Sequence, residues 1–143
     1  MELDKILGSA YTGTKRFTQQ DVRTANATGF GAVADDYAER GIDLNEQLIR
    51  NKPATFFFRM SGDAMIEAGI FDRDILIVDR SVNAVNGKVI IAVYNGELVV
   101  RRLEKNIHKI KLIPDNRRMQ PVEVQDDPDF NVWGVVMYNI HAV

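Results

Sequence analysis

The sequence predicts a mostly β protein: an antiparallel β domain of about 100 residues with one short helix, preceded by a flexible N-terminal arm. Three observations carry this prediction. From residue 54 onward, short β-prone segments follow one another at regular spacing. An Asn-Gly pair separates two of them and is a strong hairpin signal. Before residue 42 the chain is polar and rich in glycine, alanine and threonine, without a sustained period.

The N-terminal segment is expected to be an arm over residues 1–41. Its apolar residues are thinly spread, so it buries too little surface to order itself strongly. The alternative is an ordered subdomain with a short helix near Thr18–Ala27. In either case the β domain is expected to cover residues 42–143.

One short helix is expected at about residues 43–50, where Asp43 or Asn45 can cap the first turn and Pro53 prevents further extension. SGDAMIEAG at 61–69 is expected as a turn that runs into a helical turn. Alternation and β-branched or aromatic content then predict the strands. They are TFFFRM (55–60), DILIVDR (74–80), KVIIAVY (88–94), ELVVRRLEK (97–105), HKIKLIP (108–114), PVEV (121–124) and FNVWGVVMYNI (130–140).

Composition excludes several kinds of function. The chain has 143 residues, no cysteine and two histidines, which removes disulfide scaffolds, thiol catalysis and zinc held by cysteine or by three histidines. The net charge of −2 disfavours a strongly basic nucleic-acid binder. The longest apolar stretches, Ile75–Val78 and Val89–Val93, fall far short of a membrane span, and the N-terminus does not read as a signal peptide. We therefore expect a cytoplasmic protein with no cofactor, no metal and no membrane association.

A set of motifs in the β domain is weak taken singly and specific taken in order. Together they resemble the LexA/UmuD family, the self-cleaving Ser-Lys peptidases of the bacterial SOS response. The resemblance runs from about Gly29 to Val136, and the segments ADDY (34–37) and IDLN (42–45) are closer to UmuD than to LexA. The motifs are SGDAM (61–65), GIFDRDILIVD (69–79), NGKV (86–89), GELVVRRL (96–103) and LIPDN (112–116).

The resemblance implies a LexA/signal-peptidase-like β fold and a defined chemistry. In this family a serine attacks a bond in the protein's own arm, and a buried lysine, kept neutral by its surroundings, serves as the base. Backbone N–H groups at the serine turn can stabilise the oxyanion. The resemblance also implies a homodimer that contacts a RecA filament and a UmuC-type translesion polymerase, without specific DNA binding of its own.

The chain departs from the family where the chemistry resides. Ala64 stands at the nucleophile position and Arg101 at the general-base position. Alanine offers no nucleophile and arginine cannot be usefully deprotonated, so we expect self-cleavage to be silent. The bond that matches the family's cleavage site is Thr28-Gly29, and Arg73 replaces the usual glycine of the Asp-x-Asp turn. Both a natural pseudo-peptidase and an engineered Ala64 are compatible with this pattern.

The remaining site residues form the cleft and oxyanion turn around position 64, namely Ser61, Gly62, Asp63 and Met65. Ser61 is expected to be a turn residue, with a substitute nucleophile as the alternative. Adjacent strand residues face opposite ways, so one of Arg101 and Arg102 faces the cleft. We expect Arg101 to do so and to pair with a carboxylate such as Asp63, or else to bend into solvent.

The last expectations concern the two histidines and the final strand. His108 and His141 lie outside the motifs and are expected at the surface or a strand edge, with a base or a metal pair as the alternative. Dimer pairing is expected around residues 130–140 through an exposed strand edge. The leading function is a UmuD-like accessory role in SOS mutagenesis. Alternatives are a truncated LexA-like or phage-repressor-like regulator that acts by dimerisation, a protease with another nucleophile, and a plain structural dimer module.

Overall fold

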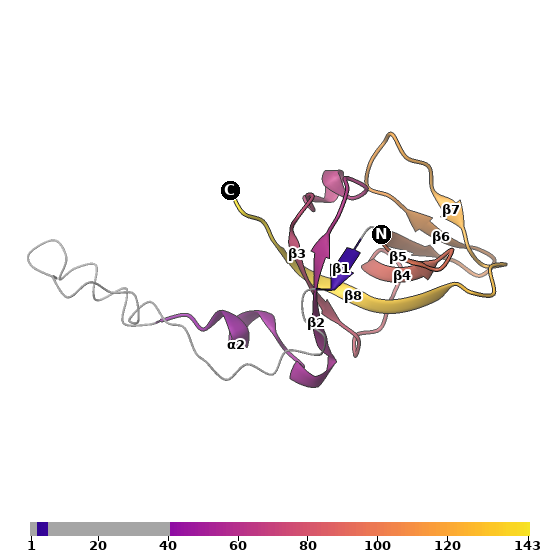
Figure 1. Ribbon diagram of the computed structural model, residues 1–143. Coiled ribbons are helices and arrows are strands. Elements are labelled where there is room, and N and C mark those ends of the chain that lie inside the picture. Colours follow the sequence, from indigo (N-terminus) through magenta and orange to yellow (C-terminus); the bar gives the residue numbers. More distant parts are fainter. Residues whose placement is uncertain (1–2, 6–40) are drawn as a thin grey trace, which may run out of the picture. The chain divides into compact units, whose positions relative to one another are not determined.

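The computed structural model describes residues 3–5 and 41–143, which Figure 1 draws in colour. The chain forms two compact units, one combining Met1–Tyr11 with Asn51–Val143 and the other comprising Thr12–Arg50. All but a few residues of the expected arm, including the alternative helix at 18–27, lie outside the described residues. Within the described part of the chain, no helix is long and apolar enough to cross a membrane.

The predicted short helix is confirmed as α2, Leu44–Leu48, in the second unit. Asp43 is its N-cap, and the Asp43 side chain accepts a hydrogen bond of 3.0 Å from the backbone N–H of Asn45. This is the capping that the sequence offered. Past the helix, Pro53 lies in the short 3-10 helix η2, Lys52–Ala54, which leads into the first long strand.

The mostly β prediction is confirmed, because the other unit is built on one sheet of eight strands, all paired antiparallel. The order across the sheet is β1-β2-β3-β8-β4-β5-β6-β7. The strands are β1 (Leu3–Lys5), β2 (Thr55–Met60), β3 (Ile75–Asp79), β4 (Val89–Tyr94), β5 (Glu97–Lys105), β6 (Ile110–Ile113), β7 (Val122–Glu123) and β8 (Asn131–Ile140). Apart from β1, each falls inside a segment that the sequence predicted.

The β4–β5 hairpin turns at Asn95-Gly96, as predicted. Tyr94 pairs with Glu97, which leaves a two-residue loop. Asn95 has φ 51° and Gly96 has φ 76°, the left-handed backbone at both loop positions that a type I′ turn requires. The turn therefore sets the register of the two strands that carry Val89 and Arg102.

The last strand, β8, was expected to present an exposed edge, but it lies inside the sheet. β8 lies between β3 and β4, pairing with β3 over Val135–Ile140 and with β4 over Asn131–Val135. The sequence pattern showed an apolar strand but could not show its neighbours. Within the described residues, the edge of 136–140 that faces away from β3 has no strand partner.

Buried side chains gather in two clusters on β5 and its neighbours. The first contains Ala64 and Met65 together with Val100, and Trp133 packs against it. Trp133 makes edge-on ring contacts with Phe56 and Phe58, at centroid distances of 5.1 and 5.0 Å. The second cluster contains the alternate β5 residues, Val99 and Leu103. The turn at residue 64 is thus part of the core of the unit.

The N-terminal strand β1 was not predicted. It pairs with β2, placing Leu3 opposite Met60, Asp4 opposite Arg59 and Lys5 opposite Phe58. β1 also contacts β5, and Figure 1 shows it beside β2. A short N-terminal segment therefore forms one end of the sheet.

Candidate functional site

The candidate site is the turn that follows β2. Gly62 has φ 94° and donates its backbone N–H to Oδ1 of Asp72 at 2.8 Å. The N–H of Ile66 then donates to the carbonyl oxygen of Asp63 at 3.2 Å, and the 3-10 helix η3, Ile66–Ala68, ends at Gly69 with φ 81°. Two left-handed glycines thus bracket the turn, a conformation that other residues adopt only at a cost.

Ala64 lies at the centre of this turn with its side chain in the core. It is 3% exposed, and the neighbouring Met65 is completely buried. A methyl group has no lone pair with which to attack a carbonyl carbon. The turn as it stands therefore carries no nucleophile at position 64.

The loop after β6 holds the turn from outside. The side-chain amide of Asn116, which is 7% exposed, donates to the carbonyl oxygen of Asp63 at 2.9 Å. The N–H of Asp115 approaches Sδ of Met65 at 3.3 Å, and the carbonyl oxygen of Asp115 accepts from the N–H of Glu67 at 2.8 Å. Backbone atoms on both sides of Ala64 are therefore fixed by residues 115 and 116.

An exposed ion pair extends this contact. Arg117 donates both its backbone N–H, at 3.0 Å, and its Nε, at 3.1 Å, to one carboxylate oxygen of Glu67. The hydrogen bond from the Arg117 backbone is the main reason why the pKa of Glu67 lies below its ordinary value. Both groups reach solvent, so the pair orients the loop more than it stabilises the fold.

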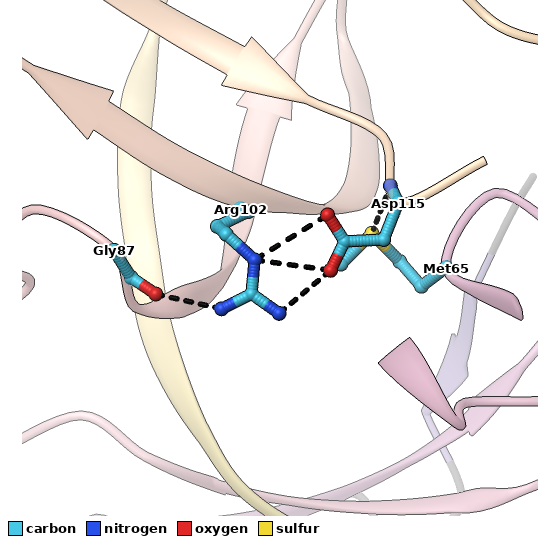
Figure 2. A network of polar contacts seen from close by, with 4 residues as sticks. All are labelled: Met65, Gly87, Arg102 and Asp115. Carbon is cyan, nitrogen blue, oxygen red and sulfur yellow. Dashed lines mark hydrogen bonds and ion pairs between the residues drawn. The ribbon is translucent and has the colours of Figure 1, made fainter. Parts of the chain in front are cut away.

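Arg102 ties β5 to the same loop, as Figure 2 shows. Its Nε and Nη2 donate to Oδ2 of Asp115 at 3.0 and 2.6 Å, and its Nη1 donates to the carbonyl oxygen of Gly87 at 2.7 Å. The side chains are 38% and 19% exposed. This forked geometry is specific to arginine, because a lysine offers one point charge instead of a planar fork.

The register of β4 and β5 separates the two arginines. Arg101 pairs with Ile90 and Arg102 with Val89. Directly opposed residues of a sheet share a face, and Val89 packs against the cluster that contains Ala64. The contacts therefore associate Arg102 with the turn at position 64. Nη1 of Arg101 donates to the carbonyl oxygen of Val100 at 2.7 Å, and the general-base position of Arg101 stays a prediction.

A small hollow lies beside the turn. It has a volume of about 180 Å³ and is lined by Ala68, Ile70, Val89, Arg102 and residues 136–139 of β8. A second hollow of about 390 Å³ lies along β5, with Arg102 and Lys105 among its lining residues. Arg102 thus borders both hollows.

The Asp-x-Asp turn before β3, residues 72–74, contacts the Ala64 turn through the hydrogen bond between Asp72 and Gly62. Arg73 takes the left-handed backbone with φ 71°, and its carbonyl oxygen accepts from Nη1 of Arg59 at 3.0 Å. Asp72 is the residue that accepts from Gly62. This left-handed backbone favours glycine, so the arginine at position 73 is strained.

Asp74 and His141 form a pair that the sequence did not reveal. Asp74 is 2% exposed, and its Oδ1 lies 2.6 Å from Nδ1 of His141. Its Oδ2 accepts from the N–H of Phe71 at 2.9 Å and from the side chain of Asn139 at 2.8 Å. Burial acts to raise the pKa of Asp74, but the hydrogen bonds from Phe71, His141 and Asn139 outweigh it and leave the pKa below its ordinary value.

His141 was expected at the surface, and its side chain is 42% exposed while paired with Asp74. The two residues lie 67 positions apart, so no local pattern could bring them together. Of the other predicted positions, Ser61 to Met65 lie in the turn described above. Thr28 and Gly29 lie outside the described residues.

The fold and the turn define an antiparallel β domain with a glycine-bracketed turn after β2. The Peptidase S24-like family model matches residues 22–137, and the chain belongs to this family, which confirms the LexA/UmuD membership expected from the sequence. Protein ImpA of Salmonella typhimurium is 37% identical over 121 residues, covering 79% of this chain and 77% of that protein. Protein SamA of Salmonella typhimurium strain LT2 is 38% identical over 116 residues, covering 79% and 78%. LexA repressor 1 of Xanthomonas oryzae pv. oryzae is 36% identical over 109 residues, covering 76% of this chain but 54% of the repressor.

Proposed function

We propose that the chain is a UmuD-like accessory protein of the SOS response that acts in error-prone translesion DNA synthesis without cleaving itself. The observation that carries this proposal is the turn at Ala64. The carbonyl oxygen of Asp63 accepts from Asn116 and the N–H of Glu67 donates to Asp115, while the side chain of Ala64 between them is a buried methyl group. Such a chain keeps a scaffold for partners and loses the reaction.

The proposed partners follow from the resemblance to UmuD. They are a second copy of the chain, a RecA filament and a UmuC-type translesion polymerase, met in the cytoplasm. Dimer contact through residues 136–140 is supported by the backbone edge that faces away from β3, because open strand edges pair readily. Contacts of this kind join proteins, so the net charge of −2 is no obstacle.

A second candidate is a regulator that dimerises with a full-length repressor, and the similarity to LexA repressor 1 favours it. Coverage favours the first candidate, because the chain spans 77% and 78% of ImpA and SamA but 54% of the repressor. Co-purification with a UmuC-type polymerase and with a LexA-type repressor separates the two. Retention of the polymerase alone supports the accessory role, and retention of the repressor alone replaces it.

Catalytic silence is tested by incubating the unchanged chain with RecA, ATP and single-stranded DNA and measuring its intact mass. We expect a single mass, because Ala64 has no nucleophilic atom. Arg101 stays protonated and therefore cannot act as a base. A fragment pair from the unchanged chain would refute the silence and point to another nucleophile.

A restoration experiment then tests the scaffold. The double variant Ala64→Ser, Arg101→Lys is incubated at alkaline pH, where more of the lysine is neutral, with and without RecA filaments. The matched control is Ala64→Ser, Arg102→Lys, which moves the lysine to the neighbouring strand position on the opposite face. Cleavage at Thr28-Gly29 in the first variant alone would assign the base position to Arg101. Cleavage in the control alone would assign it to Arg102. An intact mass for both folded variants would mean that the cleft has diverged and that only a binding role remains.

A further inference from the structure

The chain contains two Asn-Gly pairs, Asn86-Gly87 and Asn95-Gly96, and both lie in exposed turns. An asparagine followed by glycine readily loses its side-chain amide, because glycine has no side chain to hinder the approach of its backbone nitrogen. The dipeptide alone therefore makes the two pairs equally reactive. Their hydrogen bonds in the structure make them different.

Asn86-Gly87 is held at both of its reacting groups. Oδ1 of Asn86 accepts from the backbone N–H of Lys105 at 2.8 Å. The N–H of Gly87 donates to the carbonyl oxygen of Leu103 at 2.7 Å. The Gly87 nitrogen can approach the Asn86 amide only after both hydrogen bonds have broken. This pair is therefore protected as long as β5 stays in place.

Asn95-Gly96 lies in the two-residue loop between β4 and β5, where Tyr94 pairs with Glu97. Both loop residues are exposed and have left-handed backbones. Within the described part of the chain, neither the side chain of Asn95 nor the N–H of Gly96 has a hydrogen-bond partner. The reacting groups of this pair are therefore free to meet when the loop fluctuates.

The reaction needs only the chain and water. The backbone nitrogen of Gly96 attacks the side-chain carbonyl carbon of Asn95, and a new C–N bond closes a five-membered imide ring. The bond from that carbon to the side-chain nitrogen breaks, and ammonia leaves with the proton that the Gly96 nitrogen gives up. Water then opens the imide at one of its two carbonyl carbons, which yields aspartate or isoaspartate.

The two products have different consequences for the hairpin. Aspartate keeps the backbone, and Asp-Gly suits the type I′ turn as well as Asn-Gly does. Isoaspartate routes the backbone through the former side chain and so adds one carbon to it. The two-residue loop between Tyr94 and Glu97 has no room for this extra atom without a change in its geometry.

We propose that Asn95 is a site of spontaneous deamidation in the folded protein, that Asn86 is protected, and that isoaspartate at position 95 loosens the β4–β5 hairpin. Arg101 and Arg102 lie on the second strand of that hairpin, so the modification acts on the strand that borders the candidate site. The inference concerns the chemistry of the two turns and does not depend on the proposed role in the SOS response.

The first experiment compares the two pairs inside one molecule. Trypsin cleaves after lysine and arginine, which places Asn86 in peptide 81–88 and Asn95 in peptide 89–101. The full chain is aged at mildly alkaline pH, and both peptides are followed by mass spectrometry with fragmentation. We expect Asn95 to convert about tenfold faster than Asn86 or more, because two hydrogen bonds hold the slower pair. A sample aged in urea is the control, and there the two rates should be similar.

Each contrary outcome overturns part of the proposal. Equal rates in the folded chain, or a faster Asn86, overturn the protection of Asn86. An Asn95 that converts in urea but stays intact in the folded chain overturns the modification site.

The second experiment tests the cause of the protection. Lys105→Pro removes the N–H that holds Oδ1 of Asn86, and Lys105→Ala keeps it. Circular dichroism checks that both variants are folded. We expect Asn86 to convert faster in the proline variant than in the alanine variant, with Asn95 unchanged. Equal Asn86 rates in the two folded variants overturn the role of this hydrogen bond. If the proline variant is unfolded, the comparison of folded and urea-treated wild-type chains decides the protection.

The third experiment measures the effect on the hairpin. The deamidated fraction is separated by ion exchange, and half of it is treated with an isoaspartyl methyltransferase, which converts isoaspartate to aspartate. We expect the untreated half to unfold at a lower urea concentration than the treated half and than the variant Asn95→Asp. Equal unfolding midpoints for a fraction that contains isoaspartate overturn the loosening of the hairpin.

Discussion

Replacing Arg73 with glycine should stabilise the protein. Arg73 holds φ 71°, a left-handed backbone that costs a non-glycine residue about 1–2 kcal/mol. Glycine loses more conformational freedom on folding, which offsets about 0.5–1 kcal/mol of that gain. The hydrogen bonds at this position use backbone atoms: the N–H donates to Met60 at 2.8 Å and the carbonyl oxygen accepts from Arg59 at 3.0 Å. Both survive the change, so we expect a net stabilisation of about 0.5–1 kcal/mol.

Urea unfolding measures this effect, followed through the fluorescence of Trp133, which is the single tryptophan and packs edge-on against Phe56 and Phe58. The midpoint should rise with an unchanged slope, and the melting temperature should rise by about 2–4 °C. Arg118→Gly is the control, because Arg118 has no positive φ and should lose about 0.5–1 kcal/mol. A midpoint for Arg73→Gly at or below that of the unchanged chain would refute the assignment of strain to this turn.

Three further changes test other parts of the structure. The stability that Asp74 contributes should be complete above its ordinary pKa of 3.8 and lost as the pH falls through its lower folded-state pKa. The difference in the free energy of unfolding between the unchanged chain and Asp74→Asn, measured with urea, should be about 1–3 kcal/mol at pH 7. It should narrow near pH 3, and a constant difference would contradict the lowered pKa of Asp74. Gly134→Ala should cost about 1–3 kcal/mol, because the new Cβ would lie 2.7 Å from Cγ1 of Val78. Adding Val78→Ala should recover part of that loss in a double-mutant cycle, and strict additivity would speak against the clash. Arg102→Lys should cost under about 1 kcal/mol, since the ion pair with Asp115 is partly exposed to solvent. Raising the salt concentration should shrink the difference in stability, and a larger, salt-independent loss would assign Arg102 a packing role.

Strand positions were predictable because local chemistry decides them. TFFFRM and ELVVRRLEK coincide with β2 and β5 to the residue. The left-handed pair Asn95-Gly96 joins β5 to its hairpin neighbour β4. The three residues of β1 could not be predicted in this way. A strand that short carries no readable alternation, and its formation depends on the edge that β2 presents.

Pairings across the fold were beyond a local reading. Alternation shows that Arg101 and Arg102 face opposite ways, but only the register with β4 shows which one lies beside Val89. Asn116 reaches Asp63 across 53 positions, and no motif in the LIPDN segment indicates that contact. The departures at Ala64 and Arg101 were the reverse case, because residue identity alone reveals a missing nucleophile.

The central position of β8 has a consequence for how the chain is made. β8 is the last strand in chain order, yet it is the only described strand that joins β3 to β4. The ribosome adds about 5–20 residues each second, and β3 leaves it long before β8. The edge of β3 that pairs with β8 therefore stays unpaired during synthesis. The sheet is complete only after Asn131–Ile140 has been synthesised. In that interval a chaperone or a neighbouring nascent chain competes with β8 for the same backbone groups.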